Sequence, residues 1–216
     1  MKFTPFLRAR AALTVGLMVL VGTTIFAQQL SSASPAEQET AKLVSNMIKK
    51  YHISQKPLDD RISAMLLQRF VKELDPQKFY FLQGDIDDLA KYRDHLDDLL
   101  KMGDVKFAHE LFLLYVKRLD ERIVTAHKFI DTPQDFTNDE NLDIDGEKLS
   151  WSIDLKEVNE RWRKKVKYEL LTLQLDKIAS EKARERLHKR YDTLRRTAHE
   201  MEDSEVLEMY LSSMAH

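Results

Sequence analysis

The sequence contains no cysteine, which excludes disulfides and thiolate metal sites. Glycine is also scarce, and only Gly84, Gly103 and Gly146 follow the N-terminal segment. Phosphate-binding loops, dinucleotide fingerprints and Gly-x-Ser-x-Gly elbows need glycine wherever the backbone approaches a ligand closely or adopts a positive φ. Three scattered glycines cannot build any of these devices.

An excess of charge of one sign is missing as well. The 34 basic and 36 acidic residues leave a formal net charge of −2, so no global field recruits nucleic acid or anionic lipid. With 216 residues, of which 43% are hydrophobic and 32% charged, the chain is long enough for one globular domain with a real core.

The N-terminus has the three-part form of a secretory signal. Lys2, Arg8 and Arg10 precede the apolar run Ala11–Phe26, which is shorter than the roughly 20 apolar residues that span a bilayer comfortably. We therefore predict a signal peptide at residues 1–27, cleaved after Ala27, and a soluble, exported chain. Removal of three bases and no acids would lower the net charge from −2 to −5. The alternative is an uncleaved membrane anchor.

Residues 28–39 are rich in Ser, Ala and Gln and include Pro35, a composition that predicts a short flexible leader. Beyond it, apolar residues recur at helical spacing, and alternating runs typical of strands are scarce. The fold class predicted is all-α, a bundle of six to seven helices with one long, irregular, acidic loop. The helices are expected near residues 36–51, 58–74, 84–103, 107–130, 154–173, 180–200 and 204–216.

The spacing also predicts which faces are buried. In the first helix Leu43, Met47 and Ile48 share a face. The clearest stripe is in the fourth helix, at Phe107, Leu111, Tyr115, Leu119, Ile123, Ala126 and Ile130. In the third helix the aspartates are expected to face water; they are Asp87, Asp88, Asp94, Asp97 and Asp98. The segment Phe79–Leu82 is too apolar for an exposed loop, so we expect it to fill a gap between helices.

The acidic connection at residues 131–154 contains half of a calcium-binding loop. Residues 141–146 place oxygen ligands at positions one, three and five and glycine at six, but position twelve is Ser152 instead of a bidentate Glu. The favoured interpretation is a turn rich in Asx residues that packs Leu142, Ile144 and Trp151 against the bundle.

The basic run at residues 161–167 encloses Trp162 and resembles a patch for nucleic acid or lipid. Trp162 and Val166 lie four residues apart, which places both on the buried stripe of a helix. We therefore predict that the basic side chains form a solvated face that pairs with the acids of residues 131–154. Export argues against nucleic acid as a partner.

The sequence supplies no residue that can be nominated as catalytic, cofactor-binding or metal-ligating. Two Ala-His-Glu triplets, at His109 and His199, start like a metalloprotease helix. A zincin needs a second His four residues later, where Leu113 and Asp203 stand. Four further histidines follow no ligand spacing and are expected at surfaces or helix ends; they are His52, His95, His127 and His188. No spacing isolates a general acid and base.

Three stretches together resemble the N-terminal helical domain of tail-specific, or C-terminal processing, serine proteases. The first runs from Leu58 through Phe70 and then from Leu74 to Ile86. The second comprises Asp135–Thr137, Trp151 and 161–170, and the third comprises Arg190–Tyr191, Arg195–Arg196 and 207–216. The resemblance covers roughly residues 40–216. It assigns residues 40–203 to the helical domain and 204–216 to the start of the segment that leads into a PDZ domain and the protease domain.

In that family a serine activated by a lysine performs catalysis, and both follow the PDZ domain. The resemblance therefore implies that no residue of this chain is catalytic, that it needs no cofactor and that it is inactive alone. It implies a periplasmic endopeptidase that processes exported proteins with apolar C-termini. The helical domain would frame substrate access and contact the PDZ and protease domains of its own chain and, in some members, a lipoprotein adaptor.

Two alternatives remain open. One is a stand-alone periplasmic helical adaptor; the other is a membrane-anchored helical spacer. The last helix argues against the stand-alone adaptor. A stand-alone protein is expected to cap its last helix, but residues 204–216 carry an apolar stripe without a cap. If the partner of that stripe lay beyond His216, the stripe would be exposed here.

Overall fold

The computed structural model describes residues 33–51 and 58–215, so the predicted signal peptide at residues 1–27 lies outside the described residues. The described part is all-α, as predicted. Its helices are α2 (Pro35–Tyr51), α3 (Asp60–Leu74), α4 (Gln83–Leu89), the 3-10 turn η2 (Ala90–Tyr92), α5 (Leu96–Met102), α6 (Lys106–Asp131), α7 (Leu155–Leu175), α8 (Ser180–Glu200) and α9 (Asp203–Ala215). Among the described residues, β-type pairing is confined to one isolated bridge between Leu82 and Ser152.

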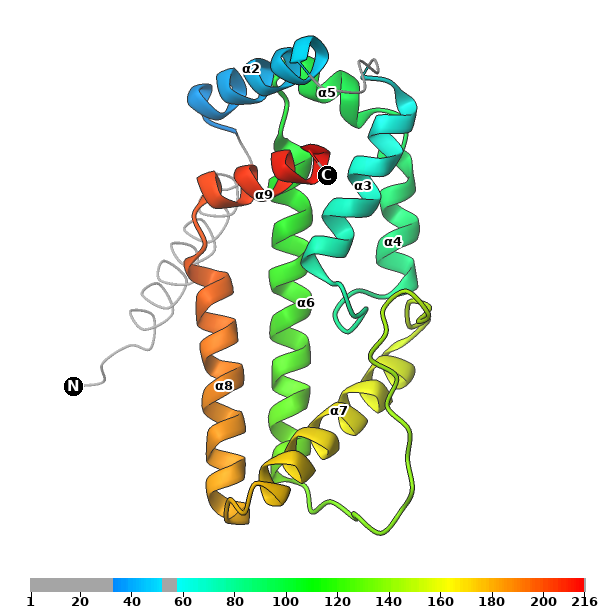
Figure 1. Cartoon of the computed structure of the whole chain (residues 1–216), viewed down its shortest axis with the longest axis vertical. Helices are drawn as coiled ribbons and strands as arrows, with labels where there is room; N and C mark the ends of the chain where they lie inside the picture. Colours follow the sequence, from blue (N-terminus) through cyan, green and yellow to red (C-terminus); the bar gives the residue numbers. More distant parts are fainter. Residues whose placement is uncertain (1–32, 52–57, 216) are drawn as a thin grey trace, which may run out of the picture.

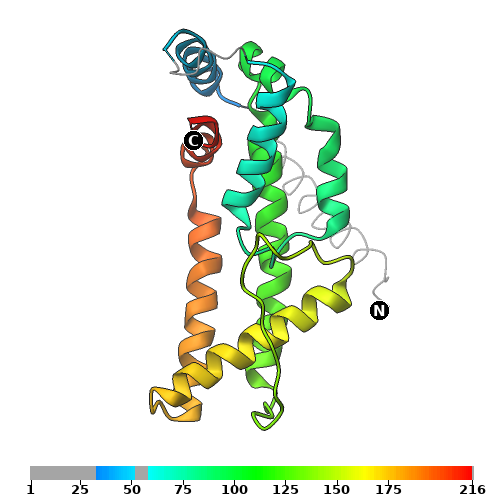
Figure 2. The same cartoon turned by 45° about the vertical axis from the view of Figure 1, so that its right-hand side comes forward.

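Helix α6 is the axis of the molecule (Figure 1). Helix α8 runs antiparallel beside it, and α7 crosses both at one end. At the other end α3 and α4 lie beside α6, and α9 lies across α3 and α6 beneath α2 (Figure 2). Because α6 touches α7, α8 and α9, one continuous core joins the two ends.

Side-chain caps begin several helices where the sequence predicts. Asp154 accepts a hydrogen bond from the Glu157 backbone N–H at 2.8 Å, and the Glu157 carboxylate accepts one from the Ile153 N–H, so α7 is capped at the residue where the sequence places its start. A capping box between Ser34 and Glu37 starts α2 at Pro35. Residues 35–39 of the expected leader are therefore helical.

The third helix expected from the sequence is divided into α4, η2 and α5, so the prediction of one continuous helix is wrong. The change of direction near His95 brings Leu96 and Asp97 onto α3. Asp97 is 3% exposed; it accepts a hydrogen bond from the Ser63 hydroxyl at 2.6 Å and one from Lys101. The expectation that Asp97 faces water is thus wrong, because the change of direction before α5 turns this side chain toward Ser63 of α3.

The predicted inner face of the first helix is wrong at Leu43 and Met47, and the side chain of its third member, Ile48, lies outside the described residues. Leu43 and Met47 are 55% and 53% exposed, whereas Ala41 and Ser45 are buried. Helix α2 caps the end of the bundle and packs on α5 and α9. The small side chains of Ala41 and Ser45 allow α2 to approach these helices closely, and the larger side chains of Leu43 and Met47 face away from them.

The stripes of α6 and α9 are both buried. That of α6 is confirmed, with Tyr115 partly buried and the other six members below 4% exposure. In α9, Tyr210 is 1% exposed and its ring lies 5.1 Å from that of Phe70 and 6.0 Å from that of Phe107. The stripe of the last helix is therefore covered by α3 and α6 and is not exposed. Over residues 33–51 and 58–215, none of the helices is both long and apolar enough to traverse a bilayer.

Candidate functional site

The turn between α3 and α4 is organised by one carboxylate, that of Asp75. Its Oδ1 accepts the Phe79 N–H at 2.8 Å, and its Oδ2 accepts the N–H groups of Tyr80 at 2.8 Å and Phe81 at 3.0 Å. Burial raises the pKa of Asp75, while these three donors and the charge of Arg161 oppose that shift. The carboxylate thus satisfies three backbone donors that a turn this deeply buried would otherwise leave without partners.

The same turn places the apolar segment in the core, as predicted. Phe79 and Phe81 are 2% and 0% exposed, and the Phe79 carbonyl accepts a hydrogen bond from the Trp162 indole at 2.7 Å. The Phe79 and Trp162 rings meet edge to face at 5.8 Å. Trp162 on α7 and the 75–82 turn therefore fix each other.

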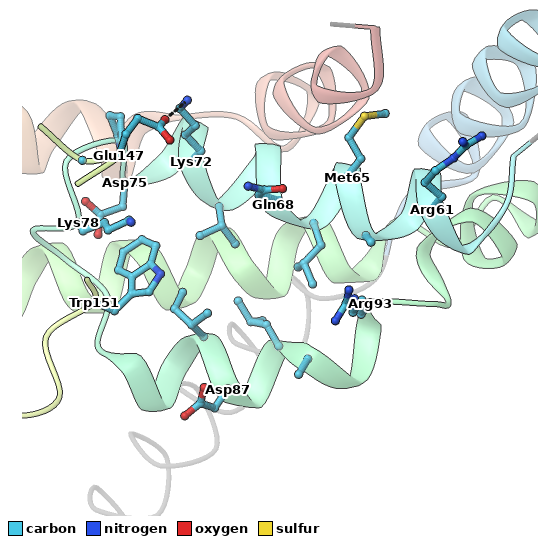
Figure 3. Close-up of a pocket in the computed structure, with 18 residues that line it drawn as sticks. Arg61, Met65, Gln68, Lys72, Asp75, Lys78, Asp87, Arg93, Glu147 and Trp151 are labelled. Carbon is cyan, nitrogen blue, oxygen red and sulfur yellow. Dashed lines mark hydrogen bonds and ion pairs between the residues drawn. The ribbon is translucent and has the colours of Figure 1, made fainter. Parts of the chain in front are cut away.

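A groove of about 630 Å³ lies outside this turn, between α3 and the α4–η2 segment (Figure 3). Its apolar lining includes Ala64, Met65, Leu67, Val71, Ile86, Leu89 and Ala90. Trp151, Lys78 and Glu147 lie at one end, and Arg61 and Arg93 lie at the other. The sequence pattern did not predict this groove, because its two walls become neighbours only after the chain turns at Asp75.

The two ends of the groove differ in electrostatics. At the Trp151 end, Lys72 pairs with Glu147, and Lys78 donates to the Leu149 carbonyl at 2.5 Å while lying 5.4 Å from the Trp151 ring. At the other end, Arg61 is 3.9 Å from the Asp59 carboxylate and its side chain is 65% exposed. Within the described part of the chain, Arg93 forms no ion pair. Positive charge is therefore available at the Arg61–Arg93 end.

The basic face of α7 pairs with the acidic loop, as predicted. Glu140 accepts hydrogen bonds from Arg163 and from Lys167, the latter at 2.5 Å. These bonds lower the pKa of Glu140 to about 2. Arg161 donates to the carbonyls of Lys78 and Ser150, which ties the loop to the 75–82 turn. Lys167 is 8% exposed, so this face is less solvated than the sequence suggested.

The tip of the acidic loop packs at Gly146 against the backbone of the 75–82 turn. A Cβ on this residue would lie 1.9 Å from the Pro76 carbonyl oxygen, closer than any side chain can approach. Only glycine at position 146 therefore allows the tip to lie this close to the turn. The next residue, Glu147, pairs with Lys72 of α3.

The half calcium loop adopts a series of Asx turns. Asp143 accepts the Asp145 N–H at 2.9 Å, and Asp145 accepts the Glu147 N–H at 3.1 Å. Leu142 and Trp151 pack against the core as predicted, but Ile144 is 55% exposed, so its predicted packing is wrong. The turn directs its side chain away from the bundle.

Histidines occur at helix contacts that the sequence did not reveal. Buried His109 on α6 has Nε2 3.2 Å from Glu37 of α2 and Nδ1 3.9 Å from Asp203 of α9. His199 faces Asp120 at 3.0 Å, and His95 is exposed, while His52 is outside the described residues. In the segments 33–51 and 58–215, no three His, Asp or Glu side chains are arranged to hold a metal ion.

The contact between α6 and α8 holds a ladder of four polar side chains. His127 and His188 stack with 2.6 Å between their Nδ1 atoms. Asp192 lies 3.1 Å from Nε2 of His127, and Asp131 lies 2.9 Å from Nε2 of His188. The signal in the sequence that could have revealed this cluster is a His-x-x-x-Asp pair on each helix, His127 with Asp131 and His188 with Asp192. These side chains join the two helices.

Comparison with known proteins gives a consistent result. Residues 44–216 match the family model described as the tail specific protease N-terminal domain. A tail-specific protease of Haemophilus influenzae is 28% identical over 187 residues, which amount to 86% of this chain and 27% of the relative. The chain thus spans about a quarter of the length of the curated relative.

Proposed function

The chain belongs to the tail-specific protease N-terminal domain family, and on this basis we propose that it is the non-catalytic helical domain of an exported serine endopeptidase. In this proposal, catalysis belongs to a serine and a lysine elsewhere in a longer polypeptide. The substrates are exported proteins with apolar C-termini. The helical domain frames their access and docks partner proteins, including a lipoprotein adaptor where one exists.

One observation carries the proposal: the family match extends over residues 44–216. The chemistry of the described residues agrees with it. The three carboxylates buried in the described part of the chain are all engaged in structural hydrogen bonds; Asp75 accepts them from backbone donors and Asp97 from Ser63. Asp85 likewise forms a bidentate pair with Arg118, at 2.6 and 2.9 Å. Groups held this way stabilise the fold and are poor candidates for proton transfer.

A domain exchange tests this function. The corresponding region of the Haemophilus influenzae protease would be replaced by this chain, and degradation of a reporter protein with an apolar C-terminal tail would be measured. We expect tail-dependent degradation by the chimera and none by the chain alone. Cleavage by the chain alone would contradict the non-catalytic role. A folded chimera that binds nothing and degrades nothing would contradict the assignment to substrate access.

The periplasmic setting and the longer polypeptide have their own test. An antibody against residues 58–215 would be used on a denaturing gel of cell fractions. We expect a periplasmic band far above 25.4 kDa, the mass of this chain. A band slightly below 25.4 kDa would favour the stand-alone adaptor, and recovery only with membranes would favour the anchored spacer.

A further inference from the structure

We propose that the groove between α3 and α4–η2 binds an amphipathic helix of a partner protein, with apolar residues on one face and carboxylates in its last turn. This inference rests on the docking role proposed above and specifies the site and the chemistry of the partner. It is carried by three features of the groove: its apolar lining, its length and its uneven charge.

The walls of the groove favour a helix over an extended peptide. Both walls are helices, whose backbone N–H and C=O groups already bond within α3 and α4. An extended peptide would therefore find few backbone partners there and would leave its own polar groups unsatisfied. A helix satisfies its backbone internally and needs only side-chain contacts, which the apolar lining supplies.

The length of the groove matches a short helix. Its lining residues on α3 run from Arg61 to Lys72. At 1.5 Å per residue this stretch is about 17 Å long, which corresponds to about three turns of a docked helix. The side chains of Ala64 and Ala90 in the lining are small, so side chains of the partner have room to contact Leu67 and Leu89.

The charges give the partner a direction. Three carboxylates line the groove: Asp75 is occupied by three backbone donors, Glu147 by Lys72, and Asp87 accepts a hydrogen bond from Gln83, so none of them strongly opposes an acidic group placed at the Arg61–Arg93 end. Arg61 and Arg93 stand exposed at the opposite end (Figure 3). A helix C-terminus carries partial negative charge, and acidic side chains in the last turn add to it. The partner helix therefore lies with its C-terminal turn at Arg61 and Arg93.

The experiment measures fluorescence anisotropy of labelled peptides added to the purified chain. The probe is a helical peptide of about 14 residues, a length of about four turns, with Leu on one face and two Glu in the last turn. We expect saturable micromolar binding that weakens as salt is added. Replacing both Glu by Lys should weaken binding by about tenfold or more. A proline in the middle of the peptide should abolish it.

Variants of the chain locate the binding site. Arg61→Glu with Arg93→Glu should lower affinity for the Glu peptide by about tenfold or more and restore binding of the Lys peptide. The matched control, Arg186→Glu with Arg196→Glu, reverses two charges on α8 and should leave affinity unchanged. Ala90→Trp should block the groove without changing its charge. Circular dichroism would confirm that each variant is folded.

Several results would overturn the proposal. These are the absence of saturable binding, equal loss in the α8 control, or unchanged binding by the proline peptide. Binding of phosphatidylglycerol vesicles that competes with the Glu peptide and depends on Arg61 and Arg93 would instead assign the groove to anionic lipid. Failure of the peptide to bind while the chimeric protease remains active would reject the groove and leave the proposed function standing.

Discussion

At the scale of residues, single polar side chains hold irregular segments that helix propensity does not specify. Asp75 supports the 75–82 turn through three backbone hydrogen bonds, and Glu140 supports the acidic loop through Arg163 and Lys167. The sequence does not distinguish these anchoring carboxylates from solvated ones, because the groups that bond them come from other parts of the fold or from backbone N–H groups. Each gives a prediction.

Asp75→Asn should destabilise the domain by roughly 3 kcal/mol, because an amide NH2 would face a backbone N–H and leave a buried donor unsatisfied. The free energy of unfolding from urea titration is the measurement. Asp87→Asn is the matched control, since Asp87 is exposed on α4 and should change stability little. Equal stability of the Asp75 variant would mean that the three hydrogen bonds do not hold the turn.

The attachment of the acidic loop should depend on pH through Glu140. Its pKa is lowered from 4.5 to about 2 in the folded chain, so its contribution is present above pH 4.5 and is lost as the pH falls toward 2. Fluorescence of Trp151, measured against a Trp162→Phe background, should report release of the loop in that window. Glu140→Gln should remove this dependence; an identical titration in the variant would contradict the assignment.

At the scale of elements, packing decides where helices break and which faces they bury. The division between α4, η2 and α5 brings Asp97 to Ser63, and α9 closes the end of the bundle over Phe70 and Phe107. Helix α9 therefore shares the core of α3 and α6, so its contribution to stability can be measured in this chain.

Tyr210→Ala should lower stability by about 4 kcal/mol, because it removes a fully buried aromatic ring from the contact between α9 and α3. Thermal unfolding followed by circular dichroism would show the loss as a reduced Tm. Ser212→Ala on the exposed face of the same helix should have little effect. Deletion of residues 204–216 should be at least as damaging; an unchanged Tm after deletion would show that α9 does not stabilise the core.

At the scale of the whole molecule, α6 spans both ends and contacts α7, α8 and α9. The Trp151 and Trp162 side chains report the junction of the 75–82 turn with the acidic loop and α7, whereas circular dichroism reports all helices. Because one core joins the ends, unfolding in urea should give coincident transitions by the two probes. Two separated transitions would show that the halves unfold independently despite the shared axis.

The sequence alone predicts the all-α class, the stripe of α6, the start of α7 near residue 154, the burial of Phe79 and Phe81 and the pairing of the α7 basic face with the acidic loop. These features depend on periodicity and short-range spacing, which a single chain displays directly. The family resemblance, confirmed by the match over residues 44–216, was likewise visible in local stretches.

Tertiary structure alone decided the rest. The break before Leu96, the exposed Leu43 and Met47, the ladder of His127 and His188 and the covering of Tyr210 all depend on which elements meet. The groove beside α3 belongs to this group, because Arg61 and Arg93 become neighbours of one cavity only through the turn at Asp75. Local spacing fixes the faces of a helix, but long-range packing selects the partner of each face, and that choice shapes the surfaces available for binding.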